Sequence, residues 1–329
     1  MNTVLFWYRN ARPTALPQSL IPSILAVSLA SSTQEFSWWL ACLAVLGVMA
    51  THLGLNLFDD YFDYIKKKSD YREELVHEGF RARISKCAYL TSGKATVKQL
   101  LKACVIFCAI GILIGCVIFY FRGITILYIA AITAVLGLFY SAPPFRFSYL
   151  GLGELIIGFI FGPLNMIGTY YAASGTIDNT ILFISVPVGL LVMNIVYVHS
   201  ILDFIPDKKI GKRTLAVLLN NTKAMLVLLF FIVFSPFAII LYGILQKYLS
   251  PFYWLVFLSF PMAISLFYLM IAYIKDPQRK FTPRFWMGPM NKWKMITEVG
   301  IDWFMIRWFS ARNLLTLFCL IILILGFIV

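Results

Sequence analysis

The chain has 329 residues, of which 60% are hydrophobic and only 13% are charged, and its mean hydropathy is +0.83. A soluble domain carries about twice that charged fraction, so this composition excludes an ordinary soluble protein and indicates a membrane protein. The net charge of +13 alone would also be compatible with a nucleic-acid partner.

Apolar runs of about 20 residues, the length that crosses a bilayer as a helix, recur along the whole chain. They predict an all-α polytopic membrane protein with about nine transmembrane helices in a single domain, residues 1–329. The predicted spans are 14–31, 36–57, 98–121, 124–142, 152–174, 180–201, 222–246, 252–274 and 312–329.

The basic residues predict the orientation of these spans. With the N-terminus in the cytoplasm, the connections on the outer side contain only Arg122 and Lys247, and the other 26 of the 28 Lys and Arg lie in or beside cytoplasmic segments. Basic loops against anionic lipid account for the net charge, so we expect a lipid bilayer and no nucleic acid as partner. The predicted location is the cell inner (cytoplasmic) membrane. The longer cytoplasmic connections are predicted at about 58–97, 202–221 and 275–311.

The last of these connections is rich in tryptophan. It holds Trp286, Trp293, Trp303 and Trp308 with basic residues between them. Tryptophan and basic side chains favour the headgroup region, so the pattern predicts an interfacial amphipathic helix that anchors the chain at the membrane surface.

An acidic cluster closes the second predicted span. Asp59, Asp60 and Asp63 follow Asn56 by three, four and seven residues, so on a helix the four side chains share one face. The three aspartates also form a DDxxD sequence. His52 lies one turn deeper in the span. It either satisfies a hydrogen bond within the protein or takes part in catalysis or acceptor binding.

A second acidic cluster closes the sixth predicted span. Asp203 and Asp207 are one turn apart and share a face if Pro206 continues the turn. His199 lies one turn membrane-ward of Asp203, the same spacing as His52 has from Asn56. Acidic residues this close to hydrocarbon are costly, which indicates a function.

Carboxylates on one helix face repel each other, and each tends to take up a proton unless a cation is near. Mg²⁺ prefers oxygen ligands and is usually held by one or two carboxylates together with substrate phosphates. The two clusters therefore predict Mg²⁺ as cofactor, with a diphosphate bridging the ions. The predicted metal ligands are Asp59, Asp60, Asp63, Asp203 and Asp207, and the predicted catalytic residues are Asp60, Asp63, Asp203, Asp207 and His199.

This arrangement predicts ionisation of an isoprenyl diphosphate. Metal ions stabilise the departing diphosphate, and the remaining allylic cation needs aromatic faces and exclusion of water. Basic residues in the flanking loops are expected to bind the phosphate oxygens. These residues are Lys94, Arg146, Lys212 and Arg213.

The motifs together resemble the UbiA superfamily of intramembrane aromatic prenyltransferases over nearly the whole chain. Within it they are most similar to the 1,4-dihydroxy-2-naphthoate polyprenyltransferases of menaquinone synthesis. The matching segments are 56–63, 140–154 and 203–217. The resemblance implies helices around a central cavity, with the active site facing the cytoplasm. It also implies polyprenyl diphosphate and an aromatic acceptor as substrates, and it adds Asn56 and Tyr140 to the substrate-binding residues.

Two departures from the naphthoate branch concern the acceptor: residues 199–202 before the second motif, and the unusual loop after the second span at 81–94. Leu202 stands where that branch usually has an Arg, which could meet a ring carboxylate. Either another basic residue, such as Arg81 or Arg83, reaches the acceptor, or the acceptor has no carboxylate. In the second case His199 is a plausible partner for a phenolic hydroxyl.

Three alternatives stay open from the sequence. Another quinone precursor or a lipid could be the prenyl acceptor. The acidic clusters could be ion sites of a transporter, although their position at span ends beside basic loops favours a diphosphate. DDxxD also occurs in soluble prenyl synthases and terpene cyclases. The nine spans exclude the soluble forms but leave a membrane cyclase of the same superfamily possible.

Overall fold

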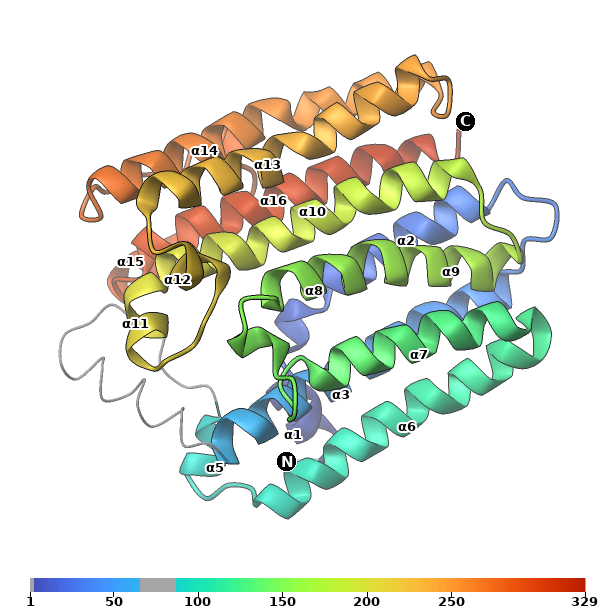
Figure 1. The fold of residues 1–329 in the computed structure, drawn as a ribbon, viewed down its shortest axis with the longest axis horizontal. Coiled ribbons are helices and arrows are strands. Elements are labelled where there is room, and N and C mark those ends of the chain that lie inside the picture. The colour runs from blue at the N-terminus through green and yellow to red at the C-terminus, as the bar shows by residue number, and fades with distance from the viewer. Residues whose placement is uncertain (1–2, 66–86, 329) are drawn as a thin grey trace.

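The computed structural model describes residues 3–65 and 87–328, so Arg81 and Arg83 lie outside the described residues. The described part is built from helices, the long ones lying side by side and roughly parallel (Figure 1). The all-α prediction is therefore confirmed. The α-helices are α1 (Thr3–Asn10), α2 (Pro17–Ala30), α3 (Trp38–Ile65), α5 (Ala88–Thr91), α6 (Val97–Arg122), α7 (Ile124–Phe139), α8 (Gly153–Phe159), α9 (Asn165–Ser174), α10 (Asn179–Leu202), α11 (Phe204–Lys209), α12 (Leu215–Leu219), α13 (Thr222–Leu245), α14 (Phe260–Lys275), α15 (Trp293–Glu298) and α16 (Asp302–Leu325).

Apolar helical segments lie at each of the predicted spans. Within the described residues, seven of them are long and apolar enough to cross a membrane, and the shorter apolar helices α2 and α7 occupy the other two predicted positions. The prediction of a polytopic membrane protein is thus confirmed. How many of these helices cross the bilayer stays a prediction.

Two of the spans are not regular α-helices. A π-helical turn, Ile160–Leu164, joins α8 to α9, and it contains Pro163. A 3₁₀ segment, Pro251–Ser259, leads into α14. Proline lacks the N–H that an α-helix interior requires, and a π-turn is a common way to accommodate such a defect.

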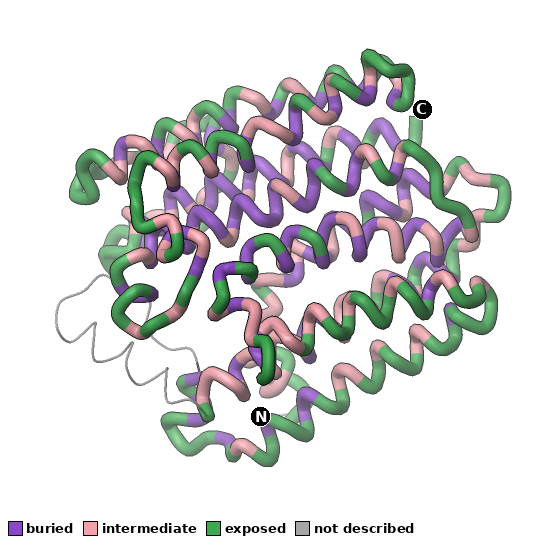
Figure 2. The backbone as a smooth tube through the Cα atoms, viewed as in Figure 1, coloured by how far each residue is buried: buried purple, intermediate pink, exposed green. Residues whose placement is uncertain are grey.

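The helix α10 lies at the centre of the bundle. It packs against α8, α13 and α16, and most of its side chains are buried, whereas α6 is largely exposed (Figure 2). An exposed apolar surface on α6 is what a lipid-facing helix requires. The second acidic cluster therefore lies at the end of the most enclosed helix of the molecule.

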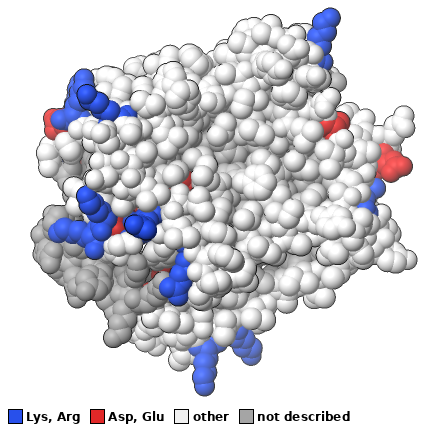
Figure 3. Space-filling view, in the orientation of Figure 1, with Lys and Arg blue, Asp and Glu red and all other residues white. Residues whose placement is uncertain are grey.

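The two ends of the bundle differ in their structure and charge. The short helices α5, α11, α12 and α15 gather at one end, here called the basic end, and tight connections join the helices at the other (Figure 1). In Figure 3 most of the visible Lys and Arg lie toward the basic end, and the middle of the molecule is almost uncharged. This distribution agrees with the asymmetry that was used to predict the orientation.

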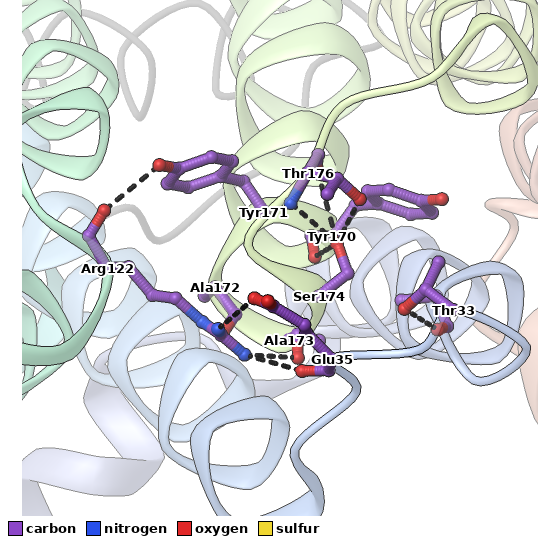
Figure 4. A network of polar contacts seen from close by, with 10 residues as sticks. Thr33, Glu35, Arg122, Tyr170, Tyr171, Ala172, Ala173, Ser174 and Thr176 are labelled. Atoms are coloured by element: carbon purple, nitrogen blue, oxygen red, sulfur yellow. Dashed lines mark hydrogen bonds and ion pairs between the residues drawn. The ribbon is translucent and has the colours of Figure 1, made fainter.

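Arg122, one of the two basic residues predicted at the opposite end, has a structural role there. Its guanidinium donates to the carbonyl oxygens of Ala172 (2.9 Å), Ala173 (2.7 Å) and Glu35 (3.0 Å), and Tyr171 donates to the Arg122 carbonyl (3.0 Å) (Figure 4). The carbonyls at a helix end have no partner within the helix. Arg122 supplies partners to those of α9 and ties this end of the bundle together.

The segment between α14 and α16 differs from its prediction. Residues 276–301, all described, contain the turn Phe285–Met287 and the six-residue helix α15, so the four tryptophans do not share one helix, and an interfacial role for α15 stays a prediction. Trp303 and Trp308 belong instead to α16, which begins ten residues before the predicted span.

The first turns of α16 enclose a buried charge. Arg307 is completely buried, donates to the carbonyls of Leu269 (3.2 Å) and Trp303, and lies 4.8 Å from the ring centre of Tyr273. Its hydrogen bonds and the aromatic ring replace the water that a guanidinium normally needs. Arg307, which lies in the predicted connection 275–311, is therefore an interior residue of a helix.

The π-turn produces a close backbone contact whose importance is testable. A Cβ on Gly189 would lie 2.6 Å from the Gly158 carbonyl oxygen and 2.9 Å from Cδ of Pro163. We expect Gly189→Ala to destabilise the protein by about 1–3 kcal/mol, because rigid backbone cannot move aside as a side chain can. Thermal unfolding of the purified protein in detergent measures this loss.

Gly115→Ala is the matched control, because a Cβ at Gly115 meets nothing within 4 Å. Alanine is the better helix former, so this substitution in α6 should be neutral or stabilising. An equal melting temperature for both variants would contradict the role given to the contact.

Candidate active site

The first acidic cluster lies on the last turns of α3. The helix continues to Ile65, so Asn56, Asp59, Asp60 and Asp63 are all helical and share one face, as the spacing predicted. Asp60 is only 2% exposed. A carboxylate this deeply buried requires partners that replace water.

Each aspartate of this cluster accepts a hydrogen bond from a hydroxyl group elsewhere in the chain. Two of the donors belong to the connection between α7 and α8, and the third to α5. Hydroxyl donors favour the charged form of a carboxylate and fix its orientation. The pairs are Ser141 to Asp59 (2.6 Å), Tyr89 to Asp60 (3.1 Å) and Tyr149 to Asp63 (2.6 Å).

The two tyrosine donors stay protonated. Burial and then the Asp63 carboxylate raise the pKa of Tyr149 above its usual range. Burial and then the Asp60 carboxylate do the same to the pKa of Tyr89. Both phenols therefore keep the proton that they donate at any pH at which the protein is expected to work.

Within the described part of the chain, Arg12 is a cation that pairs with the first cluster. Its Nη2 lies 3.2 Å from Oδ2 of Asp59 and 3.2 Å from Oδ1 of Asp60, and it donates to the Asn56 carbonyl at 2.7 Å. Burial alone would lower the pKa of Arg12, but the carboxylates of Asp60 and Asp59 raise it above its usual value. The guanidinium therefore stays charged.

The segment that carries Arg12 is fastened to the same site by further contacts. Asn56 Nδ2 donates to the Ala11 carbonyl at 3.0 Å. Phe6 and Trp7 of α1 make edge-to-face contacts with Tyr89, at ring-centre distances of 6.3 and 5.8 Å. The N-terminal segment 3–16 therefore covers the first cluster from the basic end of the bundle.

The second cluster lies where α10 meets α11. The Asp207 amide donates to the Asp203 carbonyl at 2.8 Å, so the turn continues through Pro206 and the two carboxylates are one turn apart, as predicted. Asp203 and Asp207 are 2% and 3% exposed. His199 Nε2 lies 3.0 Å from Oδ2 of Asp203.

Contacts from other helices position this second cluster. Phe304 of α16 packs edge-on against His199, and Tyr273 of α14 donates to the Leu202 carbonyl at 3.3 Å. Glu154 of α8 accepts from Ser200 Oγ (2.6 Å) and from the Leu215 amide (3.1 Å). Glu154 thereby joins α8 and α10 to the start of α12, next to the basic residues that precede it.

A cavity of about 270 Å³ connects the helices that carry the two clusters. Its walls come from the N-terminal segment and from α3, α7, α8 with its π-turn, α10 and α16. Among the predicted site residues, Asn56, Asp59, Tyr140 and His199 line it. The other lining residues are Arg12, Thr14, Ala15, Gln18, His52, Leu55, Phe58, Phe62, Gly137, Leu138, Ser141, Ile157, Ile160, Phe161, Ile195, Val196 and Trp308.

The four predicted phosphate-binding residues differ in their surroundings. Arg146 belongs to the same connection as Ser141 and Tyr149, and its buried Nε has no hydrogen-bond partner in the described part of the chain. The other three are more peripheral. Lys212 is half-buried, with its amide donating to the Asp207 carbonyl at 2.9 Å, while Lys94 and Arg213 are exposed.

The donor chemistry of the two clusters suits a hard divalent cation, because all five groups are carboxylates. Within residues 3–65 and 87–328, no three or more His, Cys, Asp or Glu side chains form a group that could hold a metal by themselves. Mg²⁺ typically takes further oxygen ligands from substrate phosphates and water, and carboxylates such as these would hold it together with those ligands.

A comparison with protein-family models identifies the fold and its chemistry. Residues 19–288 match the model of the UbiA prenyltransferase family. The chain belongs to the UbiA prenyltransferase family. It is therefore a prenyltransferase and a multi-span membrane enzyme, and the transporter alternative is excluded.

Curated relatives are similar over most of the chain. The 1,4-dihydroxy-2-naphthoate octaprenyltransferase of Mycobacterium tuberculosis is 27% identical over 66% of this chain and 70% of its own length. The enzyme of the same name from Bacillus subtilis is 26% identical, with 78% of this chain and 79% of the relative covered.

Solved structures of UbiA proteins share the fold. Digeranylgeranylglyceryl phosphate synthase superposes with a TM-score of 0.65 at 18% identity, covering 100% of both chains. A UbiA homologue from Archaeoglobus fulgidus bound to GPP and Mg²⁺ gives a TM-score of 0.55 at 17% identity, covering 96% of this chain and 99% of that one.

Four polar residues of the site were not predicted from their chemistry. They are Arg12, Ser141, Tyr89 and Tyr149. Each contacts an aspartate that is between 29 and 86 positions away in the sequence. The sequence carried one signal for two of them, since Ser141 and Tyr149 lie in the 140–154 segment that resembles the family.

Arg12 gives a prediction about the N-terminal segment. Arg12→Ala removes the ion pairs to Asp59 and Asp60, so we expect segment 3–16 to detach more often and to be cleaved faster by a protease of low specificity. Time-resolved proteolysis in detergent, read by mass spectrometry, measures the rate. Arg9→Ala is the control, because Arg9 is an exposed residue of α1. Equal cleavage of both variants would show that Arg12 does not hold the segment.

Proposed function

We propose that this enzyme transfers a polyprenyl group from a prenyl diphosphate to 1,4-dihydroxy-2-naphthoate, with Mg²⁺ as cofactor. The observation that carries the proposal is a cavity lined by residues of α3 and α10, the helices that carry the two acidic clusters. Asn56 and Asp59 enter it from α3, and His199, bonded to Asp203, enters it from α10. A diphosphate at its mouth would meet both clusters at once.

The chain's own residues have distinct parts in this proposal. Asp59, Asp60, Asp63, Asp203 and Asp207 would hold Mg²⁺, which when bound neutralises the charge that develops on the leaving diphosphate. The hydroxyls of Ser141, Tyr89 and Tyr149 hold the first three carboxylates in fixed orientations. Preorganised ligands of this kind need no rearrangement when the substrate arrives.

The cations near the clusters are assigned to the diphosphate. Arg12 and Arg146 have guanidinium groups suited to phosphate oxygens, and Lys212 follows Asp207 directly after a turn. In this proposal Arg12 moves from the carboxylates to the diphosphate when the metal enters. Arg213 and Lys94 are exposed and would contribute through longer-range attraction.

The wall of the cavity suits a carbocation. Phe58, Phe62, Phe161, Tyr140 and Trp308 line it. When the carbon–oxygen bond to diphosphate breaks, the allylic carbon becomes positive, and the aromatic faces attract this charge while apolar neighbours exclude water. The ring carbon of the acceptor then forms the new carbon–carbon bond.

The choice of acceptor rests on the curated relatives, several of which are named as 1,4-dihydroxy-2-naphthoate octaprenyltransferases. Leu202, which replaces an Arg of that branch, is 3% exposed, and its carbonyl accepts from Tyr273. It therefore has no access to a ring carboxylate.

The location follows from the asymmetry of the bundle. Both clusters lie at the basic end, and basic segments favour the cytoplasmic side of a membrane. We propose an inner-membrane protein with its N-terminus and its active site on the cytoplasmic side, where soluble prenyl diphosphates and Mg²⁺ are available.

The metal assignment predicts the effect of removing one carboxylate from each cluster. Asp60→Ala and Asp203→Ala should each lower kcat by more than about 100-fold, because metal stabilisation of the leaving group contributes several kcal/mol. Turnover of a radiolabelled prenyl diphosphate at saturating Mg²⁺ measures the loss. Asp276→Ala is the control, because Asp276 is exposed and lies in neither cluster. Near-normal turnover in either cluster variant would refute the two-cluster site.

The acceptor is tested with the purified enzyme, geranylgeranyl diphosphate, Mg²⁺ and a panel of acceptors. We expect a prenylated product from 1,4-dihydroxy-2-naphthoate in preference to 4-hydroxybenzoate, homogentisate, a carboxylate-free naphthol and a glycerol-phosphate lipid. Mass spectrometry identifies the product and shows whether the carboxylate is lost. Exclusive use of another panel member would keep the prenyl transfer and replace the acceptor. A cyclised isoprenoid formed without any acceptor would support the cyclase alternative.

A further inference from the structure

His52 lies in the wall of the cavity, one helical turn deeper than Asn56. It is 5% exposed and lines the cavity. A helix rises 1.5 Å per residue, so the His52 Cα lies about 6 Å membrane-ward of the Asn56 Cα and about 10 Å from that of Asp59. An aromatic ring fits in this interval, next to the position proposed for the diphosphate.

A single contact orients the imidazole of His52. Ser19 Oγ of α2 lies 2.7 Å from Nδ1 of His52 and donates to the Leu16 carbonyl at 3.1 Å. A serine hydroxyl has one proton, so when that proton is given to Leu16 the serine oxygen accepts the Nδ1–H of His52. Nε2 then carries no proton and is a hydrogen-bond acceptor.

Ser19 is itself held by a polar network that crosses three helices. Asn165 of α9 donates to the Ser19 carbonyl at 3.0 Å, and Ser23 donates to Asn165 Oδ1 at 2.9 Å. Thr169 also donates to Asn165 Oδ1, at 3.3 Å. Buried polar groups within a membrane protein are costly, and a satisfied network of them rigidifies its surroundings. The network fixes the side chain that fixes the imidazole.

The hydrogen bond of His52 to the described residues 3–65 and 87–328 is made through Nδ1, and Nε2 makes none with them. The Phe161 ring lies 4.6 Å from the imidazole ring, tilted by 40°, and limits its rotation. Leu55, Ile157 and Ile160 make most of the nearby cavity wall apolar. In that tautomer the imidazole presents a hydrogen-bond acceptor to the cavity beside apolar side chains, an arrangement by which a binding site selects one hydroxyl.

The second histidine of the cavity has a different environment. His199 Nε2 is already bonded to Asp203, a proposed metal ligand, at 3.0 Å. His199 therefore belongs to the diphosphate end of the cavity, and His52 to the acceptor end. This reverses the expectation from the sequence, which favoured His199 as the partner of a phenolic hydroxyl.

We propose that His52 binds one ring hydroxyl of the aromatic acceptor through Nε2, and that Ser19 is the positioning residue that orients His52. The inference rests on the proposed function, because it requires an aromatic acceptor with a hydroxyl group. The proposal places the acceptor ring at the depth of His52 in the cavity. It also requires that a substrate carry this ring hydroxyl.

The test uses the full-length protein in lipid nanodiscs with geranylgeranyl diphosphate, Mg²⁺ and 1,4-dihydroxy-2-naphthoate. His52→Ala should lower kcat/KM for the naphthoate about 10- to 100-fold, as expected for one lost hydrogen bond in a buried site. The KM for geranylgeranyl diphosphate should not change. His52→Gln keeps a hydrogen-bond acceptor and should recover part of the loss.

Ser19 is tested against a matched serine. Ser19→Ala should lower kcat/KM for the naphthoate, and Ser19→Thr, which keeps the hydroxyl, should restore it. Ser28→Ala is the control, because Ser28 is a buried serine of the same helix that donates to the Leu25 carbonyl and does not line the cavity. Equal effects of Ser19→Ala and Ser28→Ala would overturn the positioning role.

Acceptor analogues separate hydroxyl binding from a general structural effect. Wild type and His52→Ala are compared on two naphthoates that each lack one of the two ring hydroxyls. The loss caused by His52→Ala should disappear for one of the two analogues and persist for the other. An equal loss on all acceptors, no loss at all, or a raised KM for geranylgeranyl diphosphate would overturn the proposal.

The outcome is independent of the particular acceptor assigned above. If wild type uses homogentisate or 4-hydroxybenzoate instead, the naphthoate assignment fails, and the same variants are compared on that ring with and without its hydroxyl. If wild type prenylates only a glycerol-phosphate lipid, the proposal for His52 is overturned while prenyl transfer stands.

Discussion

The structure depends on holding five carboxylates at one end of an apolar bundle. Their mutual repulsion would destabilise the fold if other groups did not compensate for it. Asp60, Asp203 and Asp207 are almost fully buried, where an unpaired charge would be too costly to keep. The chain supplies hydroxyls and an arginine to hold the first cluster, and a histidine to hold Asp203. The same arrangement fixes the orientation of the carboxylates, which suits the binding of a divalent cation.

The way in which the polar contacts are distributed explains what the sequence could predict. The aspartates of each cluster are close in the chain, so their common face followed from helical spacing alone. Their partners are distant in the chain. Ser141 and Tyr149 contact Asp59 and Asp63 from the connection between α7 and α8, and Arg12 is separated from Asp59 by α2 and most of α3. Periodicity contains no information about such contacts, because they are set by how the helices pack.

The apolar helices could be located from composition because the bilayer demands a long apolar run for each of them. Their ends were harder to locate, since charge is an ambiguous signal near a membrane surface. Arg307 shows why: it lies in the predicted connection 275–311, yet aromatic rings and carbonyls enclose it within α16. Arg122 shows the converse, because a basic residue on the unexpected side serves as a helix cap.

The π-turn at Ile160–Leu164 sets the orientation of α9, which follows it in the same span, about the helix axis. A π-turn holds one residue more than an α-turn, so α9 is turned about its axis by about 100° relative to a continuous α-helix. Phe161 within the turn faces His52, and Asn165 just beyond it reaches Ser19. Deleting one residue here would yield a more regular helix of nearly the same length, still able to cross the bilayer, with its polar residues facing the wrong neighbours. The number of residues in this span is therefore set by angular phase, and the thickness of the membrane has little influence on it.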